Sequence, residues 1–424
     1  MLSNGDHRLE FKWLMPHFNR ESLIECFHEL DGKKAVGADG VTKEEYGRNL
    51  EGNIDDLLKR MRTMSYRPGP VREVLIPKDD GKGGCRPLGI SNFEDKIVQL
   101  MASKVLEAIY EPVFYDCSYG FRPGRSCHMA IKSLSKYLHD NWVETVIDVD
   151  LKNFFGTIDH WKLIKILAMK IKDERFLRYI TRMLKSGVLS DGGIIVTEEG
   201  SPQGSVVSPI LANIFAHYAL DDWINKIVKR HARRKVEVFR YCDDFVICCR
   251  YQSDAFRIRS ALDKRMKRFS LVLNESKTKL VRFSKYAYSK GLRQGCFDFL
   301  GFNFYIGTTV KGNSCVKVKT SRKRFRSKLA KVKSWIKLNR HKATLKQLWD
   351  RFRVKLNGHI RYYGVSFNSR SIRNFLFKSV AIFHKWMNRR SGRRSLNWKK
   401  FLDFIKIFPL PKVHIYHSLL HGSW

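Results

Sequence analysis

The stretch that decides the fold is Val236–Cys249, which reads Val-Glu-Val-Phe-Arg-Tyr-Cys-Asp-Asp-Phe-Val-Ile-Cys-Cys. Apolar β-formers stand on both sides of its centre, so the segment predicts a tight hairpin with Asp243 and Asp244 at its tip. Adjacent carboxylates repel each other and lose hydration on the floor of a cleft, so they are best tolerated beside divalent cations. The short pattern alone also fits a solvated Asp-Asp turn, and a second signal is needed to choose.

That second signal is Val146–His160, which places Asp150 at the end of another β-rich run. Two-metal phosphoryl transfer takes carboxylates from separate segments, because ions about 3.5 to 4 Å apart activate the attacking 3′ oxygen and stabilise the leaving pyrophosphate. Asp150, Asp243 and Asp244 meet this requirement. We predict that they are the catalytic residues of a nucleotide polymerase and that, with Leu151, they hold two Mg²⁺ ions, with Mn²⁺ as an alternative.

Further motifs follow along the chain. They are Gly37-Ala-Asp-Gly-Val41, Ile76-Pro-Lys78, Arg86-Pro-Leu-Gly-Ile90, Tyr119-Gly-Phe-Arg-Pro-Gly-Arg-Ser126, Ser201-Pro-Gln-Gly-Ser205, Ser208-Pro-Ile-Leu-Ala-Asn213, Asn274-Glu-Ser-Lys-Thr278, Phe299-Leu-Gly-Phe302 and Gly358-His-Ile-Arg-Tyr-Tyr-Gly364. In this order and spacing, together with the three aspartates, they resemble the reverse transcriptase and maturase proteins encoded by bacterial group II introns. The resemblance runs nearly end to end. It departs from the family pattern at Cys242, where alanine is usual, and at Gly156, where an aspartate is common.

The resemblance implies an α/β (α+β) fold, the right-hand polymerase of fingers, palm and helical thumb. We expect an N-terminal helical extension over 1–70, fingers and palm over 71–305, a basic maturase-specific thumb over 306–395 and a short basic tail over 396–424. Many such proteins end in a zinc-supported His-Asn-His endonuclease. We expect none here, because the chain stops at Trp424 without paired cysteine ligands.

Local patterns support the early part of this division. Glu21–Glu29 and Asn53–Met64 have the spacing of amphipathic helices. The stretch from Val71 predicts a β-hairpin whose turn is Asp79–Gly84, followed by a helix over Asn92–Tyr110.

Three residues are assigned to the nucleotide by the resemblance. In related polymerases the residues matching Lys78 and Arg86 contact the triphosphate, and the residue matching Gln203 contacts the deoxynucleotide. Without the family context, the first two also fit an exposed charged turn. A glutamine amide both donates and accepts hydrogen bonds, which suits its assigned role.

Two further assignments concern the sugar and the leaving group. The resemblance places an aromatic ring at Phe155 to block the ribose 2′-hydroxyl, which implies DNA synthesis, while Phe154 is expected to be a core residue. Lys277 matches a lysine proposed to donate a proton to the departing pyrophosphate. The alternative for Lys277 is an ordinary surface lysine.

Composition predicts a nucleic-acid partner. Lys and Arg number 80 against 41 Asp and Glu, which gives a formal charge of +39 and favours a polyanion. From Lys311 onward there are 30 Lys and Arg but only two acidic residues. Between 322 and 335 cations alternate with apolar residues at helical spacing, so we expect an apolar stripe packed inward and a cationic stripe facing out. Phosphate contacts are predicted for Arg122, Arg125, Arg322, Lys323, Arg324 and Arg326.

Several protein classes are disfavoured. The sequence has no run of 18 or more apolar residues and no signal-peptide core, so we expect no membrane association. The resemblance implies a cytoplasmic bacterial protein associated with the nucleoid or with RNA. The nine cysteines are scattered and include no Cys-x-x-Cys pair, which indicates neither a disulfide framework nor a zinc site.

The resulting prediction is an RNA-directed DNA polymerase. It extends a DNA or RNA primer with deoxynucleoside triphosphates on an RNA template, binds its group II intron RNA, assists splicing and supports retromobility. One alternative is a domesticated enzyme of DNA repair or phage defence, which intron sequence beside the gene would argue against. The other is a non-catalytic RNA splicing cofactor, against which the three intact aspartates argue.

Overall fold

The computed structural model describes residues 9–77, 84–190, 193–195, 198–200, 204–390 and 396–419. Helices and strands both occur along the chain, so the predicted mixed α/β class is confirmed. The chain separates into two compact units. The first contains Met1–Lys78, Gly83–Cys127 and Val149–Lys279, and the second is built mainly from His128–Asp148 and Leu280–Trp424. The predicted division into four parts is finer than this and stays a prediction.

The first unit begins with helices, in agreement with the sequence pattern. They are η1 (Met15–His17), α1 (Arg20–Glu29), α2 (Lys43–Gly47), α3 (Leu50–Arg62) and α4 (Phe93–Tyr110). Capping boxes at Asn19 and Thr42 start α1 and α2, because each side chain accepts a hydrogen bond from the backbone N–H three residues later. The rings of Phe27, Tyr46 and Phe93 pack together and join α1, α2 and α4.

The predicted hairpin after residue 70 is confirmed. Strand β1 (Val71–Pro77) pairs antiparallel with β2 (Cys85–Ile90), in a register that places Arg72 opposite Ile90. Strand β1 also pairs in parallel with β4 (Val188–Ser190), which pairs with β5 (Gly193–Ile195). The resulting sheet has the order β2-β1-β4-β5. The predicted turn lies almost wholly outside the described residues.

The decisive stretch forms β6 (Val236–Tyr241) and β7 (Asp244–Cys249), which belong to the sheet β6-β7-β3-β8 with β3 (Thr145–Val149) and β8 (Lys279–Arg282). Every residue of β7 after Asp244 is buried. The remaining helices of the first unit are η2 (Phe154–Thr157), α6 (His160–Ala168), α7 (Glu174–Leu184), α8 (Ser208–Ala216), the π-helices η3 (His217–Asp221) and η4 (Ile224–Val228), α9 (Lys229–His231) and α10 (Gln252–Arg268).

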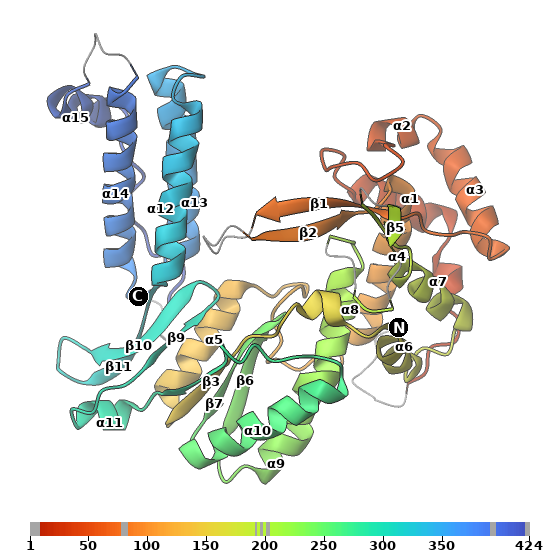
Figure 1. Cartoon of the computed structure of the whole chain (residues 1–424), viewed down its shortest axis with the longest axis horizontal. Coiled ribbons are helices and arrows are strands. Elements are labelled where there is room, and N and C mark those ends of the chain that lie inside the picture. The colour runs from red at the N-terminus through yellow and green to blue at the C-terminus, as the bar shows by residue number, and fades with distance from the viewer. Residues whose placement is uncertain are drawn as a thin grey trace. The chain divides into compact units, whose positions relative to one another are not determined.

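The second unit combines a small sheet with long helices. Its elements are α5 (Cys127–Asp140), α11 (Lys285–Ser289), β9 (Cys296–Phe299), β10 (Phe302–Thr308), β11 (Ser314–Thr320), α12 (Arg322–Asn339), α13 (Leu345–Tyr363), α14 (Ser369–Asn388) and α15 (Trp398–Ile407). Helices α12, α13 and α14 run side by side (Figure 1). The fully buried Trp349 packs on Phe383 and Phe401, so aromatic rings hold α13, α14 and α15 together. Within the described part of the chain, no helix is both long and apolar enough to span a membrane.

Candidate active site

The tip of the β6–β7 hairpin is a two-residue turn. Tyr241 pairs with Asp244, so Cys242 and Asp243 are the turn residues. The backbone of Cys242 has φ +60°, a value that tight hairpin turns require and that usually selects glycine or asparagine. The predicted hairpin is therefore confirmed, with Asp243 in the turn and Asp244 at the first position of β7.

Asp150 follows β3 directly and is fixed by the segment around Asn274. The backbone N–H of Asn274 donates to the Asp150 carbonyl oxygen at 2.8 Å, and the Asn274 amide donates to Asp150 Oδ2 at 2.8 Å. The next residue, Leu151, forms an antiparallel bridge with Leu273. Both the backbone and the carboxylate of Asp150 are thus held by residues more than 120 positions away in the sequence.

Lys277 also binds Asp150. Its ammonium donates to the same carboxylate oxygen, Oδ2, at 3.0 Å. The two side chains are 61% and 41% exposed, so the ion pair is solvated and contributes little to stability. Its importance is positional, because it places the predicted proton donor at one of the predicted catalytic carboxylates.

Asp243 responds electrostatically to two other predicted site residues. Burial raises the pKa of its carboxyl, and the negative charge of Asp150 raises this pKa further, whereas a backbone hydrogen bond and the positive charge of Arg86 lower it. The charges of Asp150 and Arg86 thus act on the Asp243 carboxyl in opposite directions. The buried Asp243 carboxylate, with the negative charge of Asp150 acting on it, would be stabilised by a bound cation, because a metal ion dominates the local electrostatics.

The donor set fits Mg²⁺ by its chemistry. Carboxylate and carbonyl oxygens are the hard ligands that Mg²⁺ prefers, and the first unit supplies Asp150, Leu151, Asp243 and Asp244. Among the described residues, however, no group of three or more His, Cys, Asp or Glu side chains is gathered closely enough to hold a metal ion. The assignment of Mg²⁺ to these ligands stays a prediction.

The predicted nucleotide contacts are described only in part. Lys78 and Gln203 lie outside the described residues. Arg86 is exposed on β2. Gly204, which follows Gln203, has φ +112°, and a Cβ there would come within 2.6 Å of the Gly89 carbonyl oxygen, so the segment passes directly against β2.

Gln99 is a polar residue of this region that sequence reasoning missed. It is buried on α4, where its Oε1 accepts hydrogen bonds from Ser205 Oγ at 2.9 Å and from the Val206 N–H at 3.1 Å. Gln99 therefore anchors the chain directly after the predicted nucleotide-binding turn. The only signal in the sequence was a polar residue within the otherwise apolar run Ile97–Ala102.

The two phenylalanines of η2 differ as predicted. Phe154 is 2% exposed, which confirms it as a core residue, whereas Phe155 is partly exposed. Asn153 has φ +47°, and its amide fills the space beside Gly156, where a Cβ would come within 2.3 Å of Asn153 Nδ2. Glycine at 156, a departure from the family pattern, is therefore matched to the left-handed Asn153 beside it.

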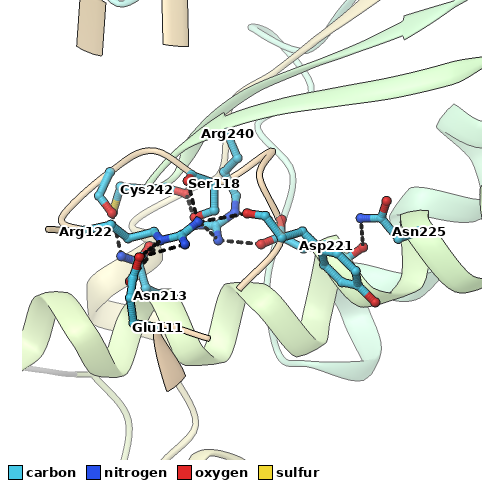
Figure 2. Close-up of polar contacts among 10 residues, drawn as sticks. Glu111, Ser118, Arg122, Asn213, Asp221, Asn225, Arg240 and Cys242 are labelled. Carbon is cyan, nitrogen blue, oxygen red and sulfur yellow. Dashed lines mark hydrogen bonds and ion pairs between the residues drawn. The ribbon is translucent and has the colours of Figure 1, made fainter. Parts of the chain in front are cut away.

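Arg122, for which a template contact is predicted, is buried and bonded inside the fold. Its side chain is 4% exposed and makes an ion pair with Glu111, with Nη2 and Oε1 at 2.8 Å (Figure 2). Nη1 donates to the carbonyl oxygens of Tyr115 and Ser118 at 2.8 and 2.9 Å. The donors of Arg122 are therefore bonded inside the fold, and its predicted template contact stays a prediction.

Arg125 is more exposed than Arg122. Its side chain is 24% exposed and pairs with Asp116, which is 92% exposed. Because Asp116 is solvated, a phosphate could take its place beside Arg125 at little cost in free energy. The predicted phosphate contact of Arg125 stays a prediction.

Helix α12 carries the predicted basic stripe in the second unit. Ser321 caps the helix by accepting from the Arg324 N–H. The predicted apolar stripe packs less deeply than expected, because its residues are only half-buried and Ile336 is the buried residue of α12. Phe325 nevertheless packs on Phe375 of α14. The predicted phosphate-binding residues of this helix are all exposed: Arg322, Lys323, Arg324 and Arg326.

Comparison with known proteins agrees with this geometry. A family model described as reverse transcriptase (RNA-dependent DNA polymerase) matches residues 76–304. The group II intron-encoded protein LtrA of Lactococcus lactis subsp. cremoris is 35% identical over 212 residues, which are 50% of this chain and 35% of that protein. Protein YkfC of Escherichia coli (strain K12) is 34% identical over 285 residues, covering 59% of this chain and 73% of YkfC.

A protein of Schizosaccharomyces pombe is also similar to this chain. The uncharacterized 91 kDa protein in the cob intron of Schizosaccharomyces pombe is 38% identical over 210 residues, 49% of this chain. The match spans only 25% of that protein and 35% of LtrA, so the chain covers a minor part of the length of these relatives. YkfC is covered over most of its length.

Proposed function

The chain belongs to the reverse transcriptase family, and from this premise we propose that it is an RNA-directed DNA polymerase of the group II intron type. The observation that carries the proposal is the placement of two carboxylates from separate segments: Asp150 directly follows β3, and Asp243 lies in the turn of the β6–β7 hairpin, whose strand β7 neighbours β3 in the sheet. Two-metal phosphoryl transfer needs such a pair of segments. A decayed polymerase would not be expected to keep them.

In the proposed arrangement the two units contain the parts of a right-hand polymerase. Residues 71–305 supply fingers and palm, 306–395 the thumb, 1–70 an N-terminal extension and 396–424 a tail. The three-helix group α12, α13 and α14 is long, basic and suited to lie along a nucleic-acid duplex.

Asp150, Asp243 and Asp244, with the Leu151 carbonyl, would hold the Mg²⁺ ions. When bound, these ions lower the pKa of the primer 3′-hydroxyl and neutralise charge on the triphosphate. The chain positions the substrate. Arg86, together with Lys78 and Gln203, would bind the incoming deoxynucleotide, and the ring of Phe155 would exclude a 2′-hydroxyl.

Lys277 would complete the chemistry. The primer 3′ oxygen forms a bond to the α-phosphorus, and the bond from that phosphorus to the bridging oxygen of pyrophosphate breaks. The leaving oxygen then takes a proton from the Lys277 ammonium, whose present partner is Asp150 Oδ2. Because the Asn274 amide binds the same oxygen, Asp150 keeps one hydrogen-bond donor when Lys277 leaves it.

Binding of a group II intron RNA, help with its splicing, and copying of the RNA after insertion at a DNA target extend the proposal. The support is the likeness to LtrA, a group II intron-encoded protein, together with the exposed cations of α12. These roles need RNA affinity beyond that of a primer duplex, which the excess of positive charge supplies.

The test is primer extension on an RNA template with deoxynucleoside triphosphates. We expect extension in Mg²⁺, its loss when Mg²⁺ is chelated, and its return when Mg²⁺ is restored. Binding of the same template and primer, measured by filter retention, separates failure of chemistry from failure of assembly. Tight binding without extension would contradict the polymerase proposal and favour a non-catalytic splicing cofactor. An RNA release and splicing assay on the flanking intron then tests the maturase role.

A further inference from the structure

Arg240, two residues before the hairpin turn, is a buried arginine whose charge is matched inside the fold. Arg240 and Asp221 have side chains that are 1% and 0% exposed. Nε of Arg240 donates to Asp221 Oδ1 at 2.8 Å, and Nη2 donates to Asp221 Oδ2 at 2.5 Å. This two-point pairing fixes the plane of the guanidinium.

The other donors of Arg240 reach three different segments. Nη1 donates to the Cys242 carbonyl oxygen at 3.2 Å and to Asn213 Oδ1 at 3.0 Å, while Nη2 also donates to Ser118 Oγ at 2.7 Å (Figure 2). An arginine has five N–H groups, and here each has one acceptor. Lysine, with three donors on a single nitrogen, cannot reproduce this fork.

The hairpin tip needs support of this kind. Cys242 holds φ +60° without being glycine or asparagine, and such a conformation persists only where the surroundings enforce it. The Cys242 carbonyl belongs to the peptide that joins Cys242 to Asp243. A hydrogen bond from Arg240 to that carbonyl therefore limits how the Asp243 backbone is oriented.

The same cluster also fixes what packs against the turn. Asn213 donates from Nδ2 to the Gly120 carbonyl oxygen at 2.6 Å, and a Cβ on Gly120 would come within 2.6 Å of the Cys242 backbone nitrogen. Asp221 is the last residue of the π-helix η3, an unusual local geometry often found at functional sites. Three segments thus meet at the turn through one guanidinium.

Stability alone is a weak reason for such a cluster. Replacing a buried ion pair with apolar side chains of similar volume is often neutral or stabilising, whereas removing one partner is strongly destabilising. A pair retained for the fold alone could therefore be exchanged for two apolar residues without loss. A pair that orients a hydrogen-bond donor toward the turn could not be exchanged in this way without disturbing the turn.

We propose that Arg240, held by Asp221, is a positioning residue that fixes the Cys242–Asp243 peptide and so orients the carboxylates of the hairpin tip for nucleotide transfer. The consequence for catalysis rests on the proposed polymerase function. The consequence for the geometry of the turn does not.

The test compares Arg240→Met, Asp221→Leu and the double variant with wild type. Arg240→Lys keeps the buried charge beside Asp221 and removes the fork, so it serves if the uncompensated single variants fail to fold. Arg182→Met is the matched control, because the Arg182 Nη1 also donates to two carbonyl oxygens, those of Met64 and Tyr66, in the same unit.

Two readouts are needed besides the thermal midpoint. The first is the single-turnover rate of primer extension on preassembled complexes. The second is the rate at which iodoacetamide alkylates the buried Cys242 at fixed pH, measured by peptide mass spectrometry. This rate does not depend on catalytic activity. Alkylation of Cys26, fully buried in α1, reports global unfolding in the same sample.

We expect the double variant to regain most of the thermal stability that the single variants lack. It should still extend primers about a hundredfold more slowly than wild type, the size of effect that a small misplacement produces. Alkylation of Cys242 should rise about tenfold while that of Cys26 stays unchanged, because only the turn loosens. Arg182→Met should change the thermal midpoint alone.

Recovery of both extension and Cys242 protection in the double variant would overturn the proposal, since the cluster would then be purely structural. If wild type itself fails to extend primers, the polymerase proposal fails, and the alkylation rates still decide whether Arg240 orders the turn. A rise in Cys26 alkylation equal to that of Cys242 would also count against a local role.

Discussion

The β6–β7 tip and helix α12 both concentrate charged residues, yet they hold them in opposite ways. At the tip, Arg240 and Asp221 are almost fully buried and every donor of the arginine has an acceptor. On α12 the cations predicted to bind phosphate, Arg322, Lys323, Arg324 and Arg326, are exposed. A change at the tip disturbs several bonds together, whereas a change on α12 removes one solvated charge.

This difference predicts two kinds of mutational response. Substitutions at the tip should have large, non-additive effects on the rate of nucleotide transfer and small effects on nucleic-acid binding. Substitutions on α12 should have small, additive effects on binding and almost none on the single-turnover rate. Variants at the tip, in η2 and on α12 test this contrast, in order of decreasing expected effect.

The largest effect is expected for Asp243→Asn. The substitution removes a negative charge that metal ions would balance, with little change in shape. We expect at least about a thousandfold loss of deoxynucleotide incorporation, or about 4 kcal/mol of transition-state stabilisation. Primer extension measures the loss, and filter binding should show unchanged affinity for RNA. Near-normal extension by the variant would remove the catalytic assignment of Asp243.

Gly120→Ala should come next, because its Cβ would meet the Cys242 backbone nitrogen at 2.6 Å. Neither the backbone at residue 120 nor that of Cys242 can move without a cost in free energy, so we expect the hairpin tip to shift. The single-turnover rate should fall about a hundredfold. Gly124→Ala is the control in the same loop. It has φ +68° but open space around its Cβ, so it should lower stability by about 1 kcal/mol and leave the rate intact.

The two phenylalanines of η2 give a smaller, qualitative contrast. Phe155→Val should open space beside the ribose 2′ position and raise ribonucleotide incorporation relative to deoxynucleotide by about tenfold. Phe154→Val should instead lower the free energy of unfolding by about 2 kcal/mol, since Phe154 is 2% exposed. Competition between the two nucleotide types and urea denaturation separate the outcomes. Unchanged sugar discrimination in Phe155→Val would place the steric gate elsewhere.

The smallest effect on the rate is expected on α12. Replacing Arg322, Lys323, Arg324 and Arg326 with Gln should weaken binding to unrelated nucleic acids about uniformly. It should also flatten the slope of log affinity against log salt by about 0.7 to 0.9 for each phosphate that the protein no longer neutralises. Filter binding over a salt series measures the slope. An unchanged slope would mean that these cations are only solvated surface.

A matched change on α15 sharpens that result. Lys399, Lys400 and Lys406 are exposed cations of the same unit, and neutralising them should leave the slope near its wild-type value. If neutralising α12 and α15 flattens the slope equally per charge removed, the positive charge acts diffusely and neither helix is a specific nucleic-acid-binding site.

The sequence allowed accurate prediction where structure depends on near neighbours. The hairpin at Val236–Cys249 and the helix beginning at Arg322 follow from residue spacing, and both are present. The buried Phe154 was also predicted. The family followed from the order of the motifs, and the comparisons confirm it.

The sequence could not tell one arginine from another. Arg122 and Arg125 stand three positions apart in the same motif, yet one is bound to Glu111 inside the fold and the other is partly exposed beside Asp116. Arg240 was visible beside the two aspartates, but nothing in the sequence pointed to Asp221 as its partner. The sequence likewise did not reveal that Gln99 binds Ser205 or that Asn274 binds Asp150.

By itself, then, the sequence was enough to predict the two hairpins, several helices, the three aspartates and the uneven distribution of positive charge. These depend on residue type and local periodicity. Only the tertiary structure decided which charges are consumed inside the fold and which face outward. The reason is that desolvation and hydrogen-bond satisfaction depend on distant segments: Arg240 meets Ser118 across 122 positions of sequence, and Asp150 meets Lys277 across 127.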